Sequence, residues 1–302
     1  MRPEPTKPST RRLRLISTVV VALVVLSGRA EAQAGPTNMG PIINAAARDA
    51  EPTFTTDGNT MYFNCYERGR AGGDICVTRR VSGEWTTPEI VDAVSTAEYD
   101  EVEPLLSPDG LQLYIMSARP DGVGSADFWV SDLVDGEWTE PKNLGAPFNS
   151  PDMDHCIYFT GPMWEFAYWT STRPGGYGGN DIWMSERVGG VWQPAVNLGP
   201  NVNTAASEHH SLPSPDGRSL YVTAIRADGF GGEDIFVTTR AASGAWGPLV
   251  NLGPSVNSAR NDRCPAFSPD HSVFYFDSER EGGFGNKDLW FVPYAEVVAA
   301  TR

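Results

Sequence analysis

Short apolar runs separated by turn residues recur along most of this chain, and beyond the N-terminal segment none has the 3.6-residue period of a helix. The clearest runs are Met61-Tyr62-Phe63, Leu113-Tyr114-Ile115, Leu220-Tyr221-Val222 and Phe274-Tyr275-Phe276. Each follows a turn segment that ends in Asp-Gly or Asp-His: residues 55–58, 107–110, 214–217 and 268–271. Asp-Gly between extended runs is a strong hairpin signal, because both residues tolerate positive φ. The pattern predicts short antiparallel strands.

These strands belong to a unit that repeats every 53 or 54 residues. Its best marker is an aspartate followed by a hydrophobic residue, found at Asp74, Asp127, Asp181, Asp234 and Asp288. A tryptophan follows most copies by 11 or 12 residues: Trp85, Trp138, Trp192 and Trp246. One strand precedes the turn, one follows it, one follows the aspartate and one holds the tryptophan. Four-stranded units repeated radially make a β-propeller, so the sequence predicts an all-β fold of five antiparallel blades.

The Ser-Pro-Asp-Gly turn and the run after it resemble the PD40, or WD40-like, repeat of TolB-type propellers. The resemblance covers about residues 38–294. It implies the propeller fold and makes a protein partner in the cell envelope a reasonable expectation. It implies little about activity, because propellers serve many functions.

The last unit stops after its third strand, and a copy of the missing element stands at the other end of the chain. Residues 38–44 match residues 197–203 and 251–257, which follow the fourth strands of earlier units. We therefore expect the N-terminal segment to complete the last blade, which removes an open sheet edge.

Residues 1–34 have the features of a secretory signal peptide. Arg11, Arg12 and Arg14 precede a mostly apolar stretch from Leu15 to Leu26, and small residues follow it. We expect export to the periplasm or outside the cell, by the Sec or the twin-arginine route, with residues 35–302 as one propeller domain. A retained N-terminal anchor is the alternative; after cleavage we expect no stable membrane insertion.

Charge narrows the list of partners. Without residues 1–34 the chain has 17 basic and 36 acidic residues, a formal net charge of −19. This charge repels nucleic acid and anionic lipid, which leaves cations, proteins, carbohydrates and other small molecules as ligands. We expect a monomer.

The four cysteines fall into two pairs. Cys65 and Cys76 should lie almost opposite each other on adjacent strands of blade one, where an exported protein could form a disulfide. Cys156 and Cys264 occupy equivalent positions in blades three and five, so they could meet only across the central axis.

Two sets of charged residues follow the repeat. An arginine lies eight residues before most of the repeated aspartates, and we expect each such pair to form an ion pair across its hairpin: Arg119, Arg173, Arg226 and Arg280, with Arg68 closer to Asp74. Six residues before each turn lies a carboxylate, the acidic ring: Asp49, Glu101, Asp154, Glu208 and Asp262. The ring could bind calcium or another hard cation at the channel mouth, or each carboxylate could accept backbone hydrogen bonds or pair with an arginine of a neighbouring blade.

The repeat is broken just after the acidic ring. The next two residues are His155-Cys156 in blade three, His209-His210 in blade four and Arg263-Cys264 in blade five. Imidazole, thiolate and carboxylate together could bind a zinc-type metal or supply a general acid and base. The metal candidates are His155, His209, His210, Cys156 and Cys264, and the catalytic candidates are Glu208, His209, His210 and His155. A polar channel lining is the alternative.

Blade three also lacks the usual turn. Its residues 160–166 include Trp164 and Phe166, which have no counterpart in the other turns. They could shape an apolar or sugar-stacking pocket, or could repair the packing of the altered blade. With the acidic ring and Arg263, they complete the expected ligand-binding residues.

These features lead to two function classes. The first is an exported binding module that recognises a ligand or an envelope protein at one propeller face. The second is a hydrolase or lyase with a metal-assisted or His/carboxylate site at the channel mouth, because some five-bladed propellers are carbohydrate-active enzymes.

Overall fold

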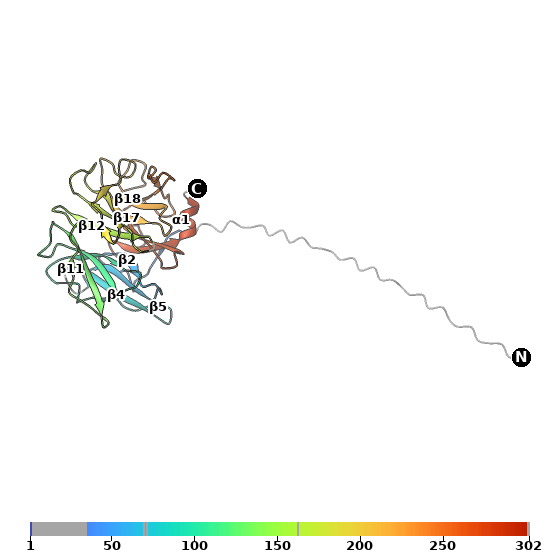
Figure 1. Cartoon of the computed structure of the whole chain (residues 1–302). Coiled ribbons are helices and arrows are strands. Elements are labelled where there is room, and N and C mark those ends of the chain that lie inside the picture. The colour runs from blue at the N-terminus through green and yellow to red at the C-terminus, as the bar shows by residue number, and fades with distance from the viewer. Residues whose placement is uncertain (2–34, 69, 71, 162, 301–302) are drawn as a thin grey trace. The chain divides into compact units, whose positions relative to one another are not determined.

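The computed structural model describes residue 1 and residues 35–300, apart from 69, 71 and 162. The expected signal peptide therefore lies outside the described residues. From residue 35 onward the chain forms five antiparallel sheets, which are the blades of a β-propeller, as the repeat predicts (Figure 1). Within the described part of the chain, no helix is long and apolar enough to cross a bilayer.

Each blade begins with its innermost strand. The first strands are β2 (Asp49–Phe54), β7 (Glu101–Leu106), β12 (Asp154–Thr160), β17 (Glu208–Pro213) and β21 (Asp262–Phe267). First strands of neighbouring blades contact one another, so they surround the central channel.

The next two strands follow as antiparallel neighbours in the same sheet. The second strands are β3 (Thr60–Tyr66), β8 (Gln112–Ser117), β13 (Phe166–Ser171), β18 (Ser219–Ala224) and β22 (Val273–Ser278). The third strands are β4 (Gly73–Val81), β9 (Asp127–Val134), β14 (Asp181–Val188), β19 (Asp234–Thr239) and β23 (Asp288–Pro293).

The outer edge of each blade is made of two-residue pieces, where the tryptophan and proline segments interrupt pairing. They are β5 (Glu84–Trp85), β6 (Glu89–Ile90), β10 (Glu137–Trp138), β11 (Lys142–Asn143), β15 (Val191–Trp192), β16 (Val196–Asn197) and β20 (Val250–Asn251). Proline suits this position because it removes a ladder donor at an edge. A short helix, α1 (Tyr294–Ala300), follows β23.

The N-terminal segment closes the ring as expected. Strand β1 (Thr37–Asn38) pairs with β23, placing Thr37 opposite Phe291 and Asn38 opposite Trp290. The backbone N–H of Met39 adds a hydrogen bond of 3.0 Å to the carbonyl oxygen of Leu289. The last blade therefore takes its outer strand from the other end of the chain.

The hydrophobic core is divided among the five gaps between blades. Each gap holds one cluster, built from the second and third strands of one blade and the face of the next. Trp169, Phe128 and Phe236 are among its largest side chains at less than 2% exposure. Full burial of one such side chain contributes about 1.5–3 kcal/mol. Packing between blades therefore stabilises the ring as a whole.

Four of the repeated aspartates bind the amides of their own hairpin loops, and the expected arginine–aspartate pairs are wrong; Asp74 pairs with Arg70 at 3.6 Å, not with Arg68. Asp181 accepts the backbone N–H of Tyr177 at 3.0 Å and of Gly178 at 3.3 Å. With the loop amides satisfying the aspartate, the arginines reach inward to the acidic ring instead, as Arg173 does to Asp154 at 2.7 Å. Arg226 differs and pairs with Asp228.

Candidate functional site

A β-bulge in every first strand creates the centre of the site. The register shifts two residues after the acidic position in all five blades. The bulged residues have positive φ, between 44° and 58°: Glu51, Glu103, Cys156, His210 and Cys264. We call these five residues the channel ring. Left-handed backbone costs a non-glycine residue roughly 1–2 kcal/mol, so the surrounding structure must hold it.

The side chains of the channel ring converge. Cys156 Sγ lies 2.9 Å from His210 Nδ1, and Cys264 Sγ lies 3.4 Å from His210 Nε2. Cys264 Sγ is also 3.3 Å from Glu51 Oε1, and the Glu103 backbone N–H donates to Glu51 Oε2 at 3.0 Å. The two unpaired cysteines therefore both contact His210, which belongs to the blade between theirs.

Burial controls the protonation of this ring. It raises the pKa of both the Cys156 and the Cys264 thiol well above the ordinary value. It also lowers the pKa of His210 well below its usual range, and His209 and His155 add to this effect. Burial, with the neighbouring Glu103 charge, raises the pKa of Glu51 to about 7. Burial therefore disfavours the charged form of four members of the channel ring: Cys156, Cys264, His210 and Glu51.

His155 pairs with Glu103, a member of the channel ring. His155 Nδ1 lies 3.5 Å from Glu103 Oε1 and 3.0 Å from Cys156 Sγ. Burial acts against both charges, but the contact between the two residues outweighs it, raising the pKa of His155 and lowering that of Glu103. His155 thus supports the ring from one side.

His209 and Arg263, two of the predicted site residues, belong to a different network. His209 Nδ1 lies 3.1 Å from Glu233 Oε1, and Arg263 Nε lies 2.5 Å from Glu233 Oε2. Arg263 also contacts Glu279 at 2.8 Å. Glu233 and Glu279 belong to the loops between second and third strands, at the end of the blades away from the Ser-Pro-Asp-Gly turns. The three histidines still lie close together, with ring centroids 5.7–6.4 Å apart.

The acidic ring is buried behind these residues. All five of its members have 0% exposure. Four hold an arginine at 2.5–2.9 Å, in the pairs Asp49–Arg68, Glu101–Arg119, Asp154–Arg173 and Asp262–Arg280. Glu208 instead accepts Thr204 N–H at 2.8 Å and the Thr204 hydroxyl at 2.6 Å. The acidic side chains thus accept hydrogen bonds or pair with an arginine of their own blade, and the expected pairing with an arginine of a neighbouring blade is wrong.

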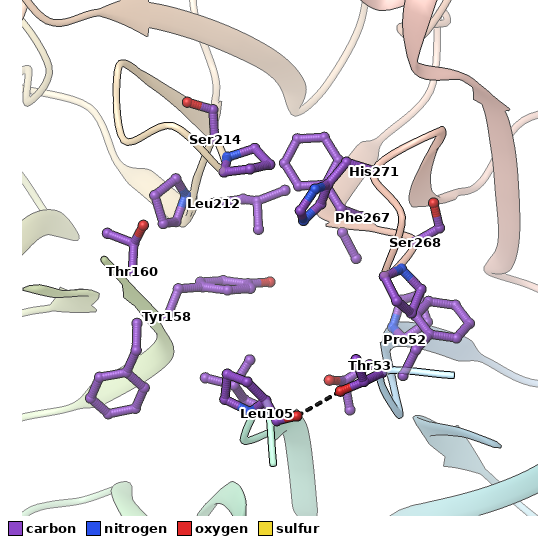
Figure 2. Close-up of a pocket in the computed structure, with 18 of the residues that line it drawn as sticks. Pro52, Thr53, Leu105, Tyr158, Thr160, Leu212, Ser214, Phe267, Ser268 and His271 are labelled. Atoms are coloured by element: carbon purple, nitrogen blue, oxygen red, sulfur yellow. Dashed lines mark hydrogen bonds between the residues drawn. The ribbon is translucent and has the colours of Figure 1, made fainter. Parts of the chain in front are cut away.

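On the face that carries the Ser-Pro-Asp-Gly turns, the channel opens into a cavity of about 400 Å³, which we call the bowl. Figure 2 shows side chains from several blades facing it, among them Tyr158, Leu212 and Phe267. Six prolines line its walls: Pro52, Pro104, Pro108, Pro213, Pro215 and Pro269. Glu51 lines the bowl and also belongs to the channel ring, so the two features meet at its carboxylate.

An aromatic groove continues from the bowl over blade three. Its cavity of about 720 Å³ is lined by Trp164 and Phe166 and shares Phe159 and Thr160 with the bowl. Trp164 stacks on Phe159, with ring centroids 4.5 Å apart and planes at 8°. The two aromatic residues that break the repeat therefore lie beside the bowl.

Cys65 and Cys76 are joined by a disulfide between β3 and β4, with Cα atoms 5.9 Å apart. Both are fully buried in the core between blades five and one. The pair serves the packing of blade one and lies outside the site.

Comparison with known proteins supports the fold. No family model matches the sequence, and no curated protein matches it. Among solved structures, TolB from Acinetobacter baumannii is similar, with a TM-score of 0.52 and 16% identity over 82% of this chain. The α-L-arabinofuranosidase PaAbf62A from Podospora anserina, solved with cellotriose, has a TM-score of 0.52 and 16% identity over 86% of this chain and 93% of its own.

A GH62 hydrolase solved with xylotriose has a TM-score of 0.54 and 12% identity over 86% of this chain and 97% of its own. This chain spans 54% of the Acinetobacter TolB chain. At these identities the likeness concerns the fold alone. The chain is therefore a five-bladed β-propeller similar in fold to TolB-type and arabinofuranosidase propellers.

Proposed function

We propose that this chain is an exported binding module that receives an apolar peptide segment of a protein partner in the bowl. The observation that carries the proposal is the composition of the bowl wall: proline rings, aromatic rings and leucines from several blades. Such a surface gains free energy by removing apolar area from water.

Several polar groups of the wall are already hydrogen-bonded within the protein, which favours a peptide over a sugar. The hydroxyls of Ser214 and Ser268 donate to Asp216 and Asp270 at 2.6 Å. Thr56 donates to Pro108 O at 2.6 Å. A sugar entering the bowl would lose water from its hydroxyls and find few partners, and unmade hydrogen bonds are costly. The stacked Trp164 and Phe159 extend the apolar surface for a longer segment.

The test uses two probes on the purified protein: the blocked peptide acetyl-Phe-Leu-Phe-amide, and xylotriose. Binding is followed by nuclear magnetic resonance shifts of the labelled protein. We expect the peptide, and not xylotriose, to shift bowl resonances. Thr160→Trp fills part of the bowl and should weaken peptide binding by about tenfold or more, equal to about 1.4 kcal/mol. Thr87→Trp, at an exposed position away from the bowl, should leave it unchanged. Shifts caused by xylotriose alone would overturn the proposal.

A hydrolase or lyase is the second candidate, favoured by one contact. Glu51 lines the bowl while its carboxylate touches Cys264 of the channel ring, so a bound molecule could reach acid–base groups. The discriminating assay is turnover of 4-nitrophenyl α-L-arabinofuranoside and of a simple lactone. Activity abolished by Glu51→Gln would favour the enzyme. No turnover, with peptide binding intact, would favour the binding module.

Export and a monomeric state belong to the same proposal. The features of residues 1–34 support secretion, and cell fractionation with N-terminal sequencing of the mature chain tests it. Light scattering of that chain during gel filtration tests the monomer.

A further inference from the structure

We propose that the channel ring binds one thiophilic divalent cation of the zinc type, with Cys264, His210, Glu51 and Cys156 as its four ligands. This cation site goes beyond peptide binding in the bowl and does not depend on it.

Three of the four donor atoms already stand at suitable separations. Zinc lies about 2.3 Å from thiolate sulfur and about 2.0 Å from imidazole nitrogen, so tetrahedral binding places the two donors about 3.5 Å apart. Cys264 Sγ is 3.4 Å from His210 Nε2 and 3.3 Å from Glu51 Oε1. Cys156 Sγ is 3.7 Å from the same Nε2, but it does not lie within 4.8 Å of all three other donors, so its side chain would have to shift to become the fourth ligand. Ligand atoms of Glu51, His210 and Cys264 all lie within 4.8 Å of one another.

The charges around Glu51 also leave room for a cation. Its carboxylate accepts from Glu103 N–H at 3.0 Å and from Asn64 Nδ2 at 3.3 Å, and among the described residues it has no ion-pair partner within 4 Å. The acidic ring differs, since most of its members each hold an arginine. Cys156 and Cys264 are 2% and 0% exposed and carry no disulfide. A bound divalent cation would convert both thiols to thiolates with release of two protons, so the net charge of the channel ring would not change.

The donor types select the class of cation. Calcium prefers six to eight oxygen ligands, which a ring with two sulfur atoms does not supply. Two thiolates, one imidazole and one carboxylate are typical of zinc and of metals that follow its chemistry. The sequence alone left calcium and zinc open; the channel ring favours zinc.

A second group of three residues has ligand atoms within 4.8 Å of one another: Glu103, His155 and Cys156. These residues already contact one another. Glu103 pairs with His155 at 3.5 Å and accepts the backbone N–H of Cys156. This arrangement suits an outer layer that orients the Cys156 ligand. A small cavity lined by Glu51, Cys156, His210 and Tyr158 shares Glu51 and Tyr158 with the bowl.

The test adds cobalt(II) to the purified mature protein, stripped of metal and kept reduced, because cobalt replaces zinc and reports its ligands by colour. We expect one equivalent to bind, with sulfur-to-cobalt charge-transfer bands and the intense visible bands of a tetrahedral site. One equivalent of zinc should bleach both. Cys264→Ser, Cys156→Ser and His210→Ala should each remove the charge-transfer signal or weaken binding at least tenfold, while thermal unfolding confirms that each variant folds.

The matched control is His209→Ala, which removes the neighbouring imidazole. His209 contacts Asn180 and Glu233, so its loss should leave the cobalt spectrum and stoichiometry unchanged. His155→Ala should keep one equivalent. A folded parent protein without charge-transfer bands would overturn the site. Loss in His155→Ala together with retention in Cys264→Ser would also overturn it, because the second group of three residues would then be the ligands.

Discussion

The side-chain amide of Asn44 holds both backbone polar groups of Leu289, a residue 245 positions further along the chain. Asn44 Nδ2 donates to Leu289 O at 3.0 Å, and Asn44 Oδ1 accepts the Leu289 N–H at 2.8 Å. The same clamp occurs inside the chain, as between Asn203 and Ile182. The propeller is thus closed by the same interaction between an asparagine side chain and a strand backbone that elsewhere links segments close together in the sequence.

Asn44→Ala should lower the free energy of unfolding by about 2 kcal/mol or more, because each buried backbone group left without a partner costs about 1–3 kcal/mol. Asn203→Ala is the matched control within one blade and should cost a similar amount. Urea denaturation measures both. Loss of stability in the control alone would mean that the N-terminal segment does not close the ring in solution.

Glu101→Gln should be one of the most destabilising single changes in the acidic ring. It removes the charge that pairs with Arg119, which is 8% exposed, and breaking a buried ion pair from one side costs about 3–5 kcal/mol. Glu208→Gln should cost only about 1 kcal/mol, because Glu208 holds Thr204 and no arginine. Equal losses in thermal and urea unfolding would contradict the assigned pairing.

Gly178→Ala should weaken the contact between blades three and four. A Cβ at this position would lie 2.1 Å from the carbonyl oxygen of Ala206, and overpacking of this kind costs about 1–3 kcal/mol. Gly247→Ala is the control, since its Cβ would meet the nearest atom, Thr239 O, at 3.4 Å; its effect should stay within about 1 kcal/mol. Calorimetry of both variants decides whether this glycine is required by the neighbouring blade.

Asp234→Asn and Asp216→Asn should change the pH dependence of stability in opposite directions. Burial raises the pKa of Asp234 in the folded protein. The stability that Asp234 contributes to the wild-type protein therefore falls as the pH rises from the ordinary pKa of aspartate to the pKa of Asp234 in the folded state. The hydrogen bond from Ser214 lowers the pKa of Asp216. The stability that Asp216 contributes is therefore present above the ordinary pKa of aspartate and is lost as the pH falls through the pKa of Asp216 in the folded state. Relative to wild type, Asp234→Asn should therefore gain with rising pH and Asp216→Asn should lose. Urea titrations at acidic and neutral pH measure the two trends, and trends of the same sign would refute the assignment.

Thiol titration in denaturant should find two reactive cysteines before reduction and four after it, since Cys65 and Cys76 are bonded and the other two are free. The double variant Cys65→Ala, Cys76→Ala should lose about 2–3 kcal/mol of stability, the order expected for a short closed loop. Four reactive thiols in the unreduced protein would show that the disulfide is not formed.

The blades could be predicted from sequence because their signals are local. Aspartate, proline and glycine at fixed offsets dictate turns, and the period carries them around the ring, including the closing match of residues 38–44. The partners of the arginines could not be predicted in this way. Sequence distance favoured the aspartate in the same hairpin, but the loop amides satisfy that aspartate first, and Arg173 instead reaches inward to Asp154.

The candidate site was predicted in part. The repeat located Cys156, His210 and Cys264, but Glu51 and Glu103 look like ordinary surface glutamates when each is taken alone. Their signal is the column that they share with the two cysteines and His210 once the repeats are aligned. The β-bulge that points these side chains toward the channel depends on how the first and second strands pair, and that register cannot be read from the sequence.

The five positive-φ residues have a consequence for how this protein could change. The bulge fixes where each side chain points but leaves its chemistry open, since glutamate, cysteine and histidine all occupy the same backbone geometry. One substitution therefore replaces one donor among five without moving the other four. Each blade therefore supplies one position at the centre of the propeller where the side chain can change while the backbone stays the same. New combinations of ligand side chains can arise there by substitution in one blade at a time.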